Sequence, residues 1–163
     1  MVVQQLNTDD LSALVSDGVP DSLVGTGVCD DVIWVKPSRI AAVSAFLKSD
    51  SGLDFNFLNS ISAVDYINHF EVVYHLTSLR KQHTAIVKTR LDGRENLTLP
   101  SVYHLWRGAD FQEREIWDLM GVRFEDHPNM KRILLWEGFE GHPLRKDYMG
   151  SNYETLCLLK LNR

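Results

Sequence analysis

The middle of the chain alternates between apolar and polar residues. The alternation is clearest in three runs, which are Leu53–Phe57, Phe70–Thr77 and Ala85–Thr89. Side chains in a β-strand point to opposite faces in turn, so a period of two with short connections predicts antiparallel strands with one buried face. The stretch from residue 53 to residue 91 is therefore predicted to form sheet.

A helix and a hairpin are predicted before this stretch. Asn7 or Thr8 can cap the helix, and Gly18 and Pro20 are expected to end it. Its predicted apolar face consists of Leu11, Leu14 and Val15. Two short apolar runs, residues 22–28 and 32–35, then lie on either side of the turn-prone pair Asp30-Asp31, an arrangement typical of a hairpin.

A second helix follows the hairpin, with Ser38 as its expected cap and Asp50-Ser51-Gly52 as its end. The apolar positions with helical spacing are Ile40, Val43, Phe46 and Leu47. The predicted element order is α-β-β-α-β-β-β. This order predicts an α+β fold, with a mainly antiparallel five-stranded sheet and two helices on one face.

Two more helices are predicted before the chain loses its periodicity. Pro100-Ser101 is expected to open a short helix over residues 101–107, closed by Gly108. A longer helix is expected over residues 110–120, with Asp110 and Glu113 in capping-box spacing and with Gly121 at the left-handed position that ends it. Its predicted apolar face consists of Phe111, Ile116, Leu119 and Met120. Residues 1–108 are therefore expected to form a sheet domain, and residues 109–163 a helix with an extended arm.

The segment from Val122 to Tyr148 is rich in Gly, Pro, His and Arg, so it cannot continue as a regular helix or strand. It nevertheless carries aromatic and aliphatic side chains such as Trp136 and Phe139. A long irregular segment is uncommon in a small domain, and aromatic residues and arginine are enriched at protein interfaces. We therefore expect this C-terminal arm to bind a protein partner.

The carboxylates of the helix over residues 110–120 permit a catalytic hypothesis. Glu113, Glu115, Asp118 and His127 could form the acid–base cluster of a free-standing enzyme, if a pocket gathered them. However, Arg114 and Asp118 have the i, i+4 spacing of a surface ion pair. This spacing favours an exposed helix face over an active site.

The sequence does not indicate metal, nucleotide, nucleic-acid or membrane binding. The six histidines lack zinc-ligand spacing, and neither nucleotide-binding glycine motif is present. Two cysteines, Cys29 and Cys157, are too few for a disulfide scaffold or a thiolate-bound cluster. A net charge of −5 argues against nucleic-acid binding. The longest apolar runs, such as Leu156–Leu159, are too short to span a bilayer, and we expect neither a signal peptide nor direct membrane insertion.

The motifs of the C-terminal third resemble a known family. They run from Glu113-Arg114-Glu115 through Asp118-Leu119-Met120-Gly121 and His127-Pro128 to Arg132-Ile133-Leu134 and Gly141–Tyr148. This spaced pattern covers about a quarter of the chain and is similar to the signature of the C-type subunit of respiratory complex I, the proton-pumping NADH:quinone oxidoreductase. The same protein is also called the 30-kDa subunit, and its plastid and cyanobacterial counterpart carries the letter J.

The resemblance implies a non-catalytic scaffold subunit of the hydrophilic arm of the complex. It implies that the chain itself has no catalytic, metal or cofactor-binding residue, with FMN and iron–sulfur clusters held by partner subunits. The expected partners are the large quinone-site subunit (the D-type subunit), mainly, and the B-type subunit, on the cytoplasmic or equivalent face of the energy-coupling membrane. The expected interface residues are Arg114, Asp118, His127, Pro128, Arg132, Phe139, His142, Pro143, Leu144, Arg145, Lys146, Asp147 and Tyr148.

Related complexes use the same type of subunit with other electron donors. The alternatives left open are therefore the equivalent subunit of a membrane-bound hydrogenase, or of a complex that takes electrons from ferredoxin or coenzyme F420. We recognise no family motif in residues 151–163, so their role stays open.

Overall fold

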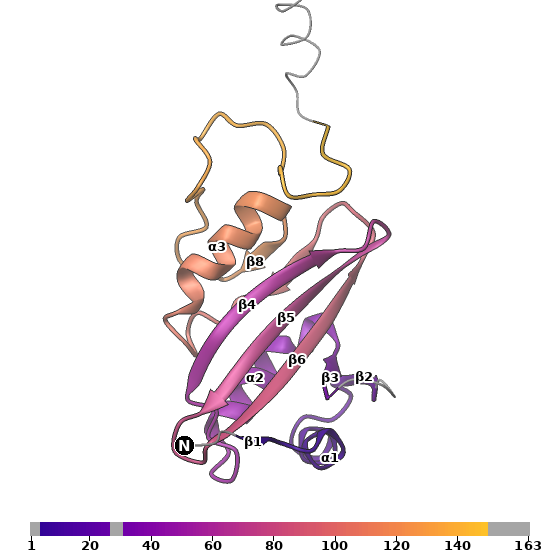
Figure 1. Cartoon of the computed structure of the whole chain (residues 1–163), viewed down its shortest axis with the longest axis vertical. Coiled ribbons are helices and arrows are strands. Elements are labelled where there is room, and N and C mark those ends of the chain that lie inside the picture. Colours follow the sequence, from indigo (N-terminus) through magenta and orange to yellow (C-terminus); the bar gives the residue numbers. More distant parts are fainter. Residues whose placement is uncertain (1–3, 27–30, 150–163) are drawn as a thin grey trace, which may run out of the picture.

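The computed structural model describes residues 4–26 and 31–149. The two cysteines, residue 30 of the predicted hairpin turn, the apolar run Leu156–Leu159 and residues 151–163 lie outside the described part. Figure 1 shows a twisted sheet with helices packed beside it and the arm at the end of the molecule opposite α1.

The larger sheet has the strand order β2-β3-β6-β5-β4, and β1 also pairs with β6. The bounds are β1 Gln4–Gln5, β2 Leu23–Thr26, β3 Ile33–Val35, β4 Phe57–Asp65, β5 His69–Ser78 and β6 His83–Asp92. The pairs β2–β3, β4–β5 and β5–β6 are antiparallel, which confirms the predicted sheet. The short strand β1 and the parallel pairing of β1 and β3 with β6 were not predicted.

The first middle strand begins later than predicted, at Phe57. The Asp50 carboxylate explains the delay, because its Oδ1 accepts the amides of Gly52 and Leu53 at 2.9 and 3.0 Å. These bonds hold the start of the predicted run in a turn after the helix. The strand extends instead through Asp65, beyond the end of the predicted run.

The first two helices are α1 (Thr8–Gly18) and α2 (Ile40–Ser49). Asn7 caps α1 as predicted, since its side chain accepts the Asp9 amide at 2.8 Å. The prediction for Leu14 was wrong, because this side chain is 48% exposed. The prediction that Ser38 caps α2 was also wrong. Ser38 lies inside the 3-10 turn Pro37–Arg39, whose continuous backbone bonds lead directly into the helix and leave no side-chain cap.

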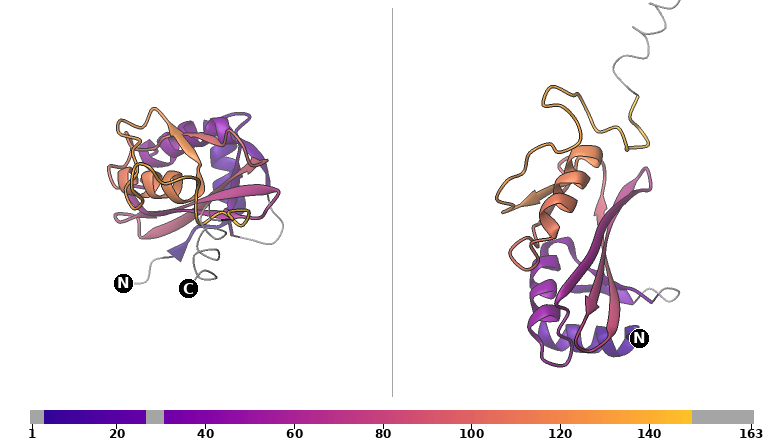
Figure 2. Two further views of the ribbon diagram at one scale, coloured as in Figure 1. Left: turned by 90° about the horizontal axis from the view of Figure 1, so that it is seen from above. Right: turned by 60° about the vertical axis from the view of Figure 1, so that its left-hand side comes forward.

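One face of the sheet forms the core. The inward side chains of β5 and β6 alternate along each strand, and cross-strand pairs such as Leu76 and Ala85 bring them together. Helices α2 and α3 (Ala109–Met120) lie on the same side of the sheet, as the right-hand view of Figure 2 shows. The opposite face carries Glu71, Lys88 and Arg90, which are partly or fully exposed.

A second, two-stranded sheet was not predicted. Strand β7 (Thr98–Pro100) pairs in parallel with β8 (Arg123–Glu125). Residues 101–107 form turns rather than the predicted short helix, because the Ser101 amide donates to the Glu125 carbonyl at 2.8 Å and continues the pairing with the strand. Residues 122–125, predicted to open the arm, therefore belong to the folded body.

Candidate functional site: the C-terminal arm

The arm consists of residues 126–149 and contains no helix or strand within the described part of the chain. It passes over the C-terminal end of α3 and returns toward the tip of the β4–β5 hairpin (Figure 1). Three polar contacts, described in turn, hold the arm to the body. Each of them uses residues that the sequence pattern assigned to a partner interface.

The first contact is a buried carboxylate on α3. Asp118 Oδ1 accepts a bond from Arg132 Nη1 at 2.6 Å. Asp118 Oδ2 accepts the amides of three consecutive residues at 2.9–3.0 Å, namely Ile133, Leu134 and Leu135. Burial alone would raise the pKa of Asp118, but these amides and the guanidinium bring it below its ordinary value.

The second contact caps the end of α3. The last carbonyls of a helix have no partner within the helix. Here His142 Nδ1 lies 2.9 Å from the Asp118 carbonyl, the Leu144 amide donates to the Leu119 carbonyl at 3.0 Å, and Arg145 Nε donates to the Met120 carbonyl at 2.6 Å. The arm thus supplies the groups that satisfy the helix terminus.

Gly121 makes this close approach possible. It has φ 75°, a left-handed conformation that suits glycine. A Cβ atom added there would lie 2.6 Å from the His142 ring and 2.8 Å from Arg145. The predicted glycine cap of α3 is therefore confirmed, and it also makes room for the arm.

The third contact fixes the end of the arm. Arg94 donates to Asp65 at 2.7 and 2.8 Å and to Asp147 at 2.5 and 2.6 Å. The Lys146 amide also donates to Asp65 at 2.8 Å. Bonding to Arg94 holds the pKa of Asp65 well below its usual range and lowers that of Asp147. Sequence reasoning missed Asp65 and Arg94, because the strand containing Asp65 was not recognised to its end.

The arm exposes several large apolar side chains. Leu134, Trp136 and Leu144 are 60%, 68% and 56% exposed, and Met149 is exposed as well. The Trp136 ring packs edge-on against the Phe139 ring, with centroids 4.8 Å apart. We name Leu134, Trp136 and Leu144 the apolar edge. Large apolar side chains that are exposed on a segment held in place are typical of an interaction surface.

The carboxylates of α3 do not all lie on an exposed helix face, as had been predicted. Arg114 does not pair with Asp118; its Nη1 lies 3.9 Å from Asp110, and its Nε donates to the Lys131 carbonyl at 3.0 Å. Asp118 faces inward because Arg132 and the arm amides offer stronger bonds than Arg114. The predicted apolar position Phe111 is exposed instead.

Glu113 is also buried, contrary to the prediction. Its Oε2 accepts a bond from Ser101 Oγ at 2.6 Å, and its Oε1 accepts the Val102 amide at 2.8 Å. The predicted capping box with Asp110 is absent, because α3 begins at Ala109 and the Glu113 carboxylate is bound to the turn after β7. Burial raises the pKa of Glu113 to about 7.

The remaining predicted interface residues divide by exposure. Pro128, Lys146 and Asp147 have exposed surface, and Pro143, Phe139 and Tyr148 are partly buried within the arm. His127 is buried beside α3. Their contact with a partner stays a prediction. The structure adds Trp136 and Leu134, which are more exposed than most of the predicted set.

The catalytic hypothesis required four groups in one pocket. Glu115 is exposed, whereas Glu113 is buried against the turn after β7 and Asp118 is buried against the arm. Only His127 and Glu113 of the four lie near each other, 4.0 Å apart. The four groups are therefore not gathered. In the described ranges, no three His, Cys, Asp or Glu side chains are placed to hold a metal ion.

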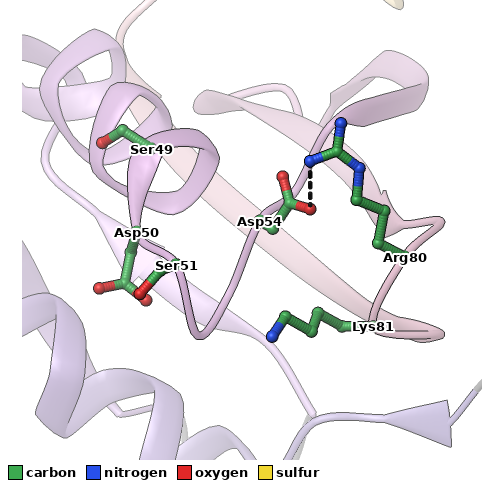
Figure 3. A pocket seen from close by; sticks show the side chains of 6 residues that line it. All are labelled: Ser49, Asp50, Ser51, Asp54, Arg80 and Lys81. Carbon is green, nitrogen blue, oxygen red and sulfur yellow. Dashed lines mark ion pairs between the residues drawn. The ribbon is translucent and has the colours of Figure 1, made fainter.

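An open hollow of about 550 Å³ lies at the other end of the molecule, between the loop after α2 and the β5–β6 turn. Figure 3 shows Arg80 turned toward Asp54, at 3.5 Å, and Lys81 extending toward the side of Ser51. Acidic and basic side chains are equally represented in its lining, so it has no net charge to select an ionic ligand. Separately, none of the helices in the described part is long and apolar enough to cross a membrane.

Comparison with known proteins agrees with this architecture. The pattern that defines the family described as "Respiratory-chain NADH dehydrogenase, 30 Kd subunit" matches residues 33–154. The match includes the larger part of the sheet, α3 and the arm. The chain therefore belongs to this family, and the resemblance found in the sequence is confirmed.

Individual relatives cover most of the chain. The C 2 subunit of the NADH-quinone oxidoreductase of Rhizobium etli (strain CIAT 652) is 40% identical over 156 residues, which are 94% of this chain and 81% of that protein. The C-type subunit of the NADH-quinone oxidoreductase of Roseiflexus sp. (strain RS-1) is 42% identical over 134 residues, which are 79% of this chain and 76% of that protein.

A solved structure shows the same fold. A chain of the membrane-bound sulfane sulfur reductase, an archaeal respiratory membrane complex, superposes with a TM-score of 0.68. The aligned region covers 94% of this chain and 89% of that chain, at 24% sequence identity. At this identity the likeness bears on the fold alone.

Proposed function

We propose that this chain is a structural subunit of a proton-pumping NADH:quinone oxidoreductase of the complex I type, and that its arm binds a neighbouring subunit. Family membership supports the type of complex, since relatives are named as the C-type subunit of NADH-quinone oxidoreductase. The observation that carries the binding role is the apolar edge, an exposed surface on an arm that internal bonds hold in place.

The neighbours proposed are the homologues of the D-type subunit, chiefly, and of the B-type subunit. In this account FMN and the iron–sulfur clusters belong to other subunits, quinone meets the chain only through the complex, and membrane association is indirect, on the cytoplasmic or equivalent face. The role of the chain is assembly. Holding the arm in one conformation before binding reduces the ordering cost of association, which favours affinity.

The apolar edge provides the test. A tagged chain produced at its native level is expected to bring down the D-type and B-type homologues from mild-detergent extracts of its own host. The double variant Trp136→Ala with Leu144→Ala should reduce their recovery at least about tenfold, because exposed aromatic and aliphatic anchors dominate binding at interfaces. The bond from the residue 144 amide to Leu119 survives this change, so the arm should keep its position.

Leu14→Ala is the matched control. Leu14 is also a largely exposed leucine, but it lies on α1, at the opposite end of the molecule from the arm. Recovery of both homologues should be unchanged in this variant. Failure of the unmodified chain to bring down either homologue would contradict the proposed function. Full recovery with the double variant would contradict the role of the apolar edge.

A further inference from the structure

Three ionisable side chains meet beneath the start of the arm. We name Asp110, Glu113 and His127 the buried cluster. The side chains of Glu113 and His127 are completely buried, and Asp110 is partly buried. His127 Nε2 lies 3.5 Å from Asp110 Oδ1 and 4.0 Å from Glu113 Oε2. The cluster joins α3, the turn after β7 and the first residues after β8.

The hydrogen bonds of His127 define where its proton lies. His127 Nδ1 accepts the Asn129 amide at 3.1 Å, so in the neutral ring the hydrogen is on Nε2. That hydrogen faces two carboxyl groups. Within the described residues, neither His127 Nε2 nor Asp110 Oδ1 has a hydrogen-bond partner. Buried polar atoms without partners are rare in proteins and indicate a site whose protonation or position can change.

The surroundings of Glu113 suit both of its protonation states. Its Oε2 lies 2.6 Å from Ser101 Oγ, and a hydroxyl can donate to a carboxylate or accept from a carboxylic acid. In the described part of the chain, no lysine or arginine forms an ion pair with Glu113. A buried carboxylate without a cation is costly, so this site favours the protonated acid.

Other titratable or charged groups near the cluster lie on β5, on α3 and in the turn after β7. Tyr74 of β5 has a buried hydroxyl without a partner, and burial together with the Glu113 charge raises its pKa. Arg114 on α3 and His104 in the turn lie within electrostatic range of His127 and disfavour its charged form. Burial is the main cause that lowers the pKa of His127. The surroundings of His127 therefore favour its neutral form.

We propose that the buried cluster is a proton-binding site that fastens the start of the arm to the body and loosens when the proton leaves. Loss of the proton leaves a buried negative charge on Glu113, close to Asp110 and to the uncharged ring of His127. The Ser101–Val102 turn and the residues around His127 pack directly on this charge, so they are the parts that loosen. The inference does not depend on the proposed function.

The direction of the pH effect follows from Glu113. Its folded-state pKa, about 7, exceeds the unfolded value of about 4.3. The proton therefore stabilises the fold fully below the unfolded value, and this stabilisation is lost as the pH rises through 7. Relative to a variant without this proton, the unfolding constant should increase on the order of 100-fold between pH 5 and pH 8. His127, whose pKa is lowered, acts in the opposite direction, at acid pH.

The experiment compares the full chain with Glu113→Gln, measuring denaturant unfolding from pH 5 to pH 8. The glutamine stays neutral and keeps an amide that can donate or accept. The ratio of the two unfolding constants should change with pH as stated. Glu115→Gln, an exposed position on the same helix, is the matched control and should retain the pH dependence of the unmodified chain.

A second measurement needs no variant. Side-chain carboxyl ¹³C shifts of the unmodified chain should show Glu113 titrating near pH 7. Amide exchange at Val102 and Asn129 should accelerate, beyond the intrinsic effect of pH, as Glu113 loses its proton. If Glu113 titrates near the unfolded value of about 4.3, or if Glu113→Gln unfolds with the same pH dependence as the unmodified chain, the proposal is wrong.

Discussion

In the sheet, apolar side chains face inward and charged ones lie on the open face, whereas the arm combines buried polar contacts with large apolar side chains that are exposed. Leu76 of β5 is buried, and Arg90 of β6 is exposed. In the arm, Arg132 is turned in to the buried Asp118, and Trp136 is turned out. The sheet is therefore stabilised by apolar burial, which is non-directional, and the arm by directional polar bonds. A segment held in this way can keep its apolar side chains free for a partner.

Among the substitutions that separate the arm from the sheet, Asp118→Ala is expected to have the largest effect, which is release of the arm. Removing one partner of a buried ion pair costs about 3–5 kcal/mol, because the remaining charge is left without compensation. Here Arg132 and three arm amides lose their acceptor together. Limited trypsin digestion should then cleave after Lys131 and Arg132 much faster than in the unmodified chain, while the sheet amides stay protected.

Glu115→Ala controls for the loss of a carboxylate from α3. Glu115 is exposed, so a surface change within about 0.5 kcal/mol is expected and digestion should be unaltered. Equal digestion of the Asp118→Ala variant and the unmodified chain would mean that the arm is held by something other than Asp118.

A substitution in the core should destabilise the whole domain and leave the arm attached. Leu76→Ala removes a buried side chain that faces Leu58 and Ala85 across the sheet, which costs about 2–5 kcal/mol including the cavity. Denaturant unfolding should show this loss for the whole domain. Below the unfolding transition the arm should stay attached, because none of its contacts involves Leu76. Selective loss of arm protection in this variant would break the distinction between the two regions.

The smallest effect is expected from Asp147→Asn. Asp147 is about half exposed, and Arg94 retains its paired bonds to Asp65. Ion pairs near solvent contribute about 0–1 kcal/mol. We expect faster amide exchange at Tyr148 without a measurable change in the unfolding midpoint. A large change in that midpoint would show that the end of the arm contributes to the fold as strongly as Asp118 does.

The elements predicted correctly from the sequence are those whose apolar residues recur with a regular period. Alternation located β5 and β6, and helical spacing with a terminal glycine located α3 closely. The same reasoning failed for Asp118, because its position relative to Arg114 suggested a surface pair. The competing partners were Arg132 and three main-chain amides some fifteen residues further along the chain. Main-chain amides have no sequence signature, so a carboxylate that binds them cannot be distinguished from an exposed one.

The arm itself was predicted as a segment, but not its attachment. Its composition predicted an irregular segment that binds a partner; the irregular structure is confirmed, and the binding stays a prediction. The basic residues were expected to face a partner. Arg132 bonds the buried Asp118 instead, and Arg145 bonds the end of α3, contacts that are visible only once the helix end and the arm are placed together. The apolar edge follows from that arrangement, since the backbone that binds Asp118 leaves Leu134 facing outward.

Amide hydrogen exchange at Ile133, Leu134 and Leu135 in the full chain without partners tests the central claim most directly. If Asp118 holds the arm, these three amides should exchange well below their intrinsic rates, and more slowly than the amides of Glu137 and Gly138. Their protection should be lost in Asp118→Ala. Exchange of all three at intrinsic rates in the unmodified chain would contradict the account, since the arm would then have no fixed position before it meets a partner.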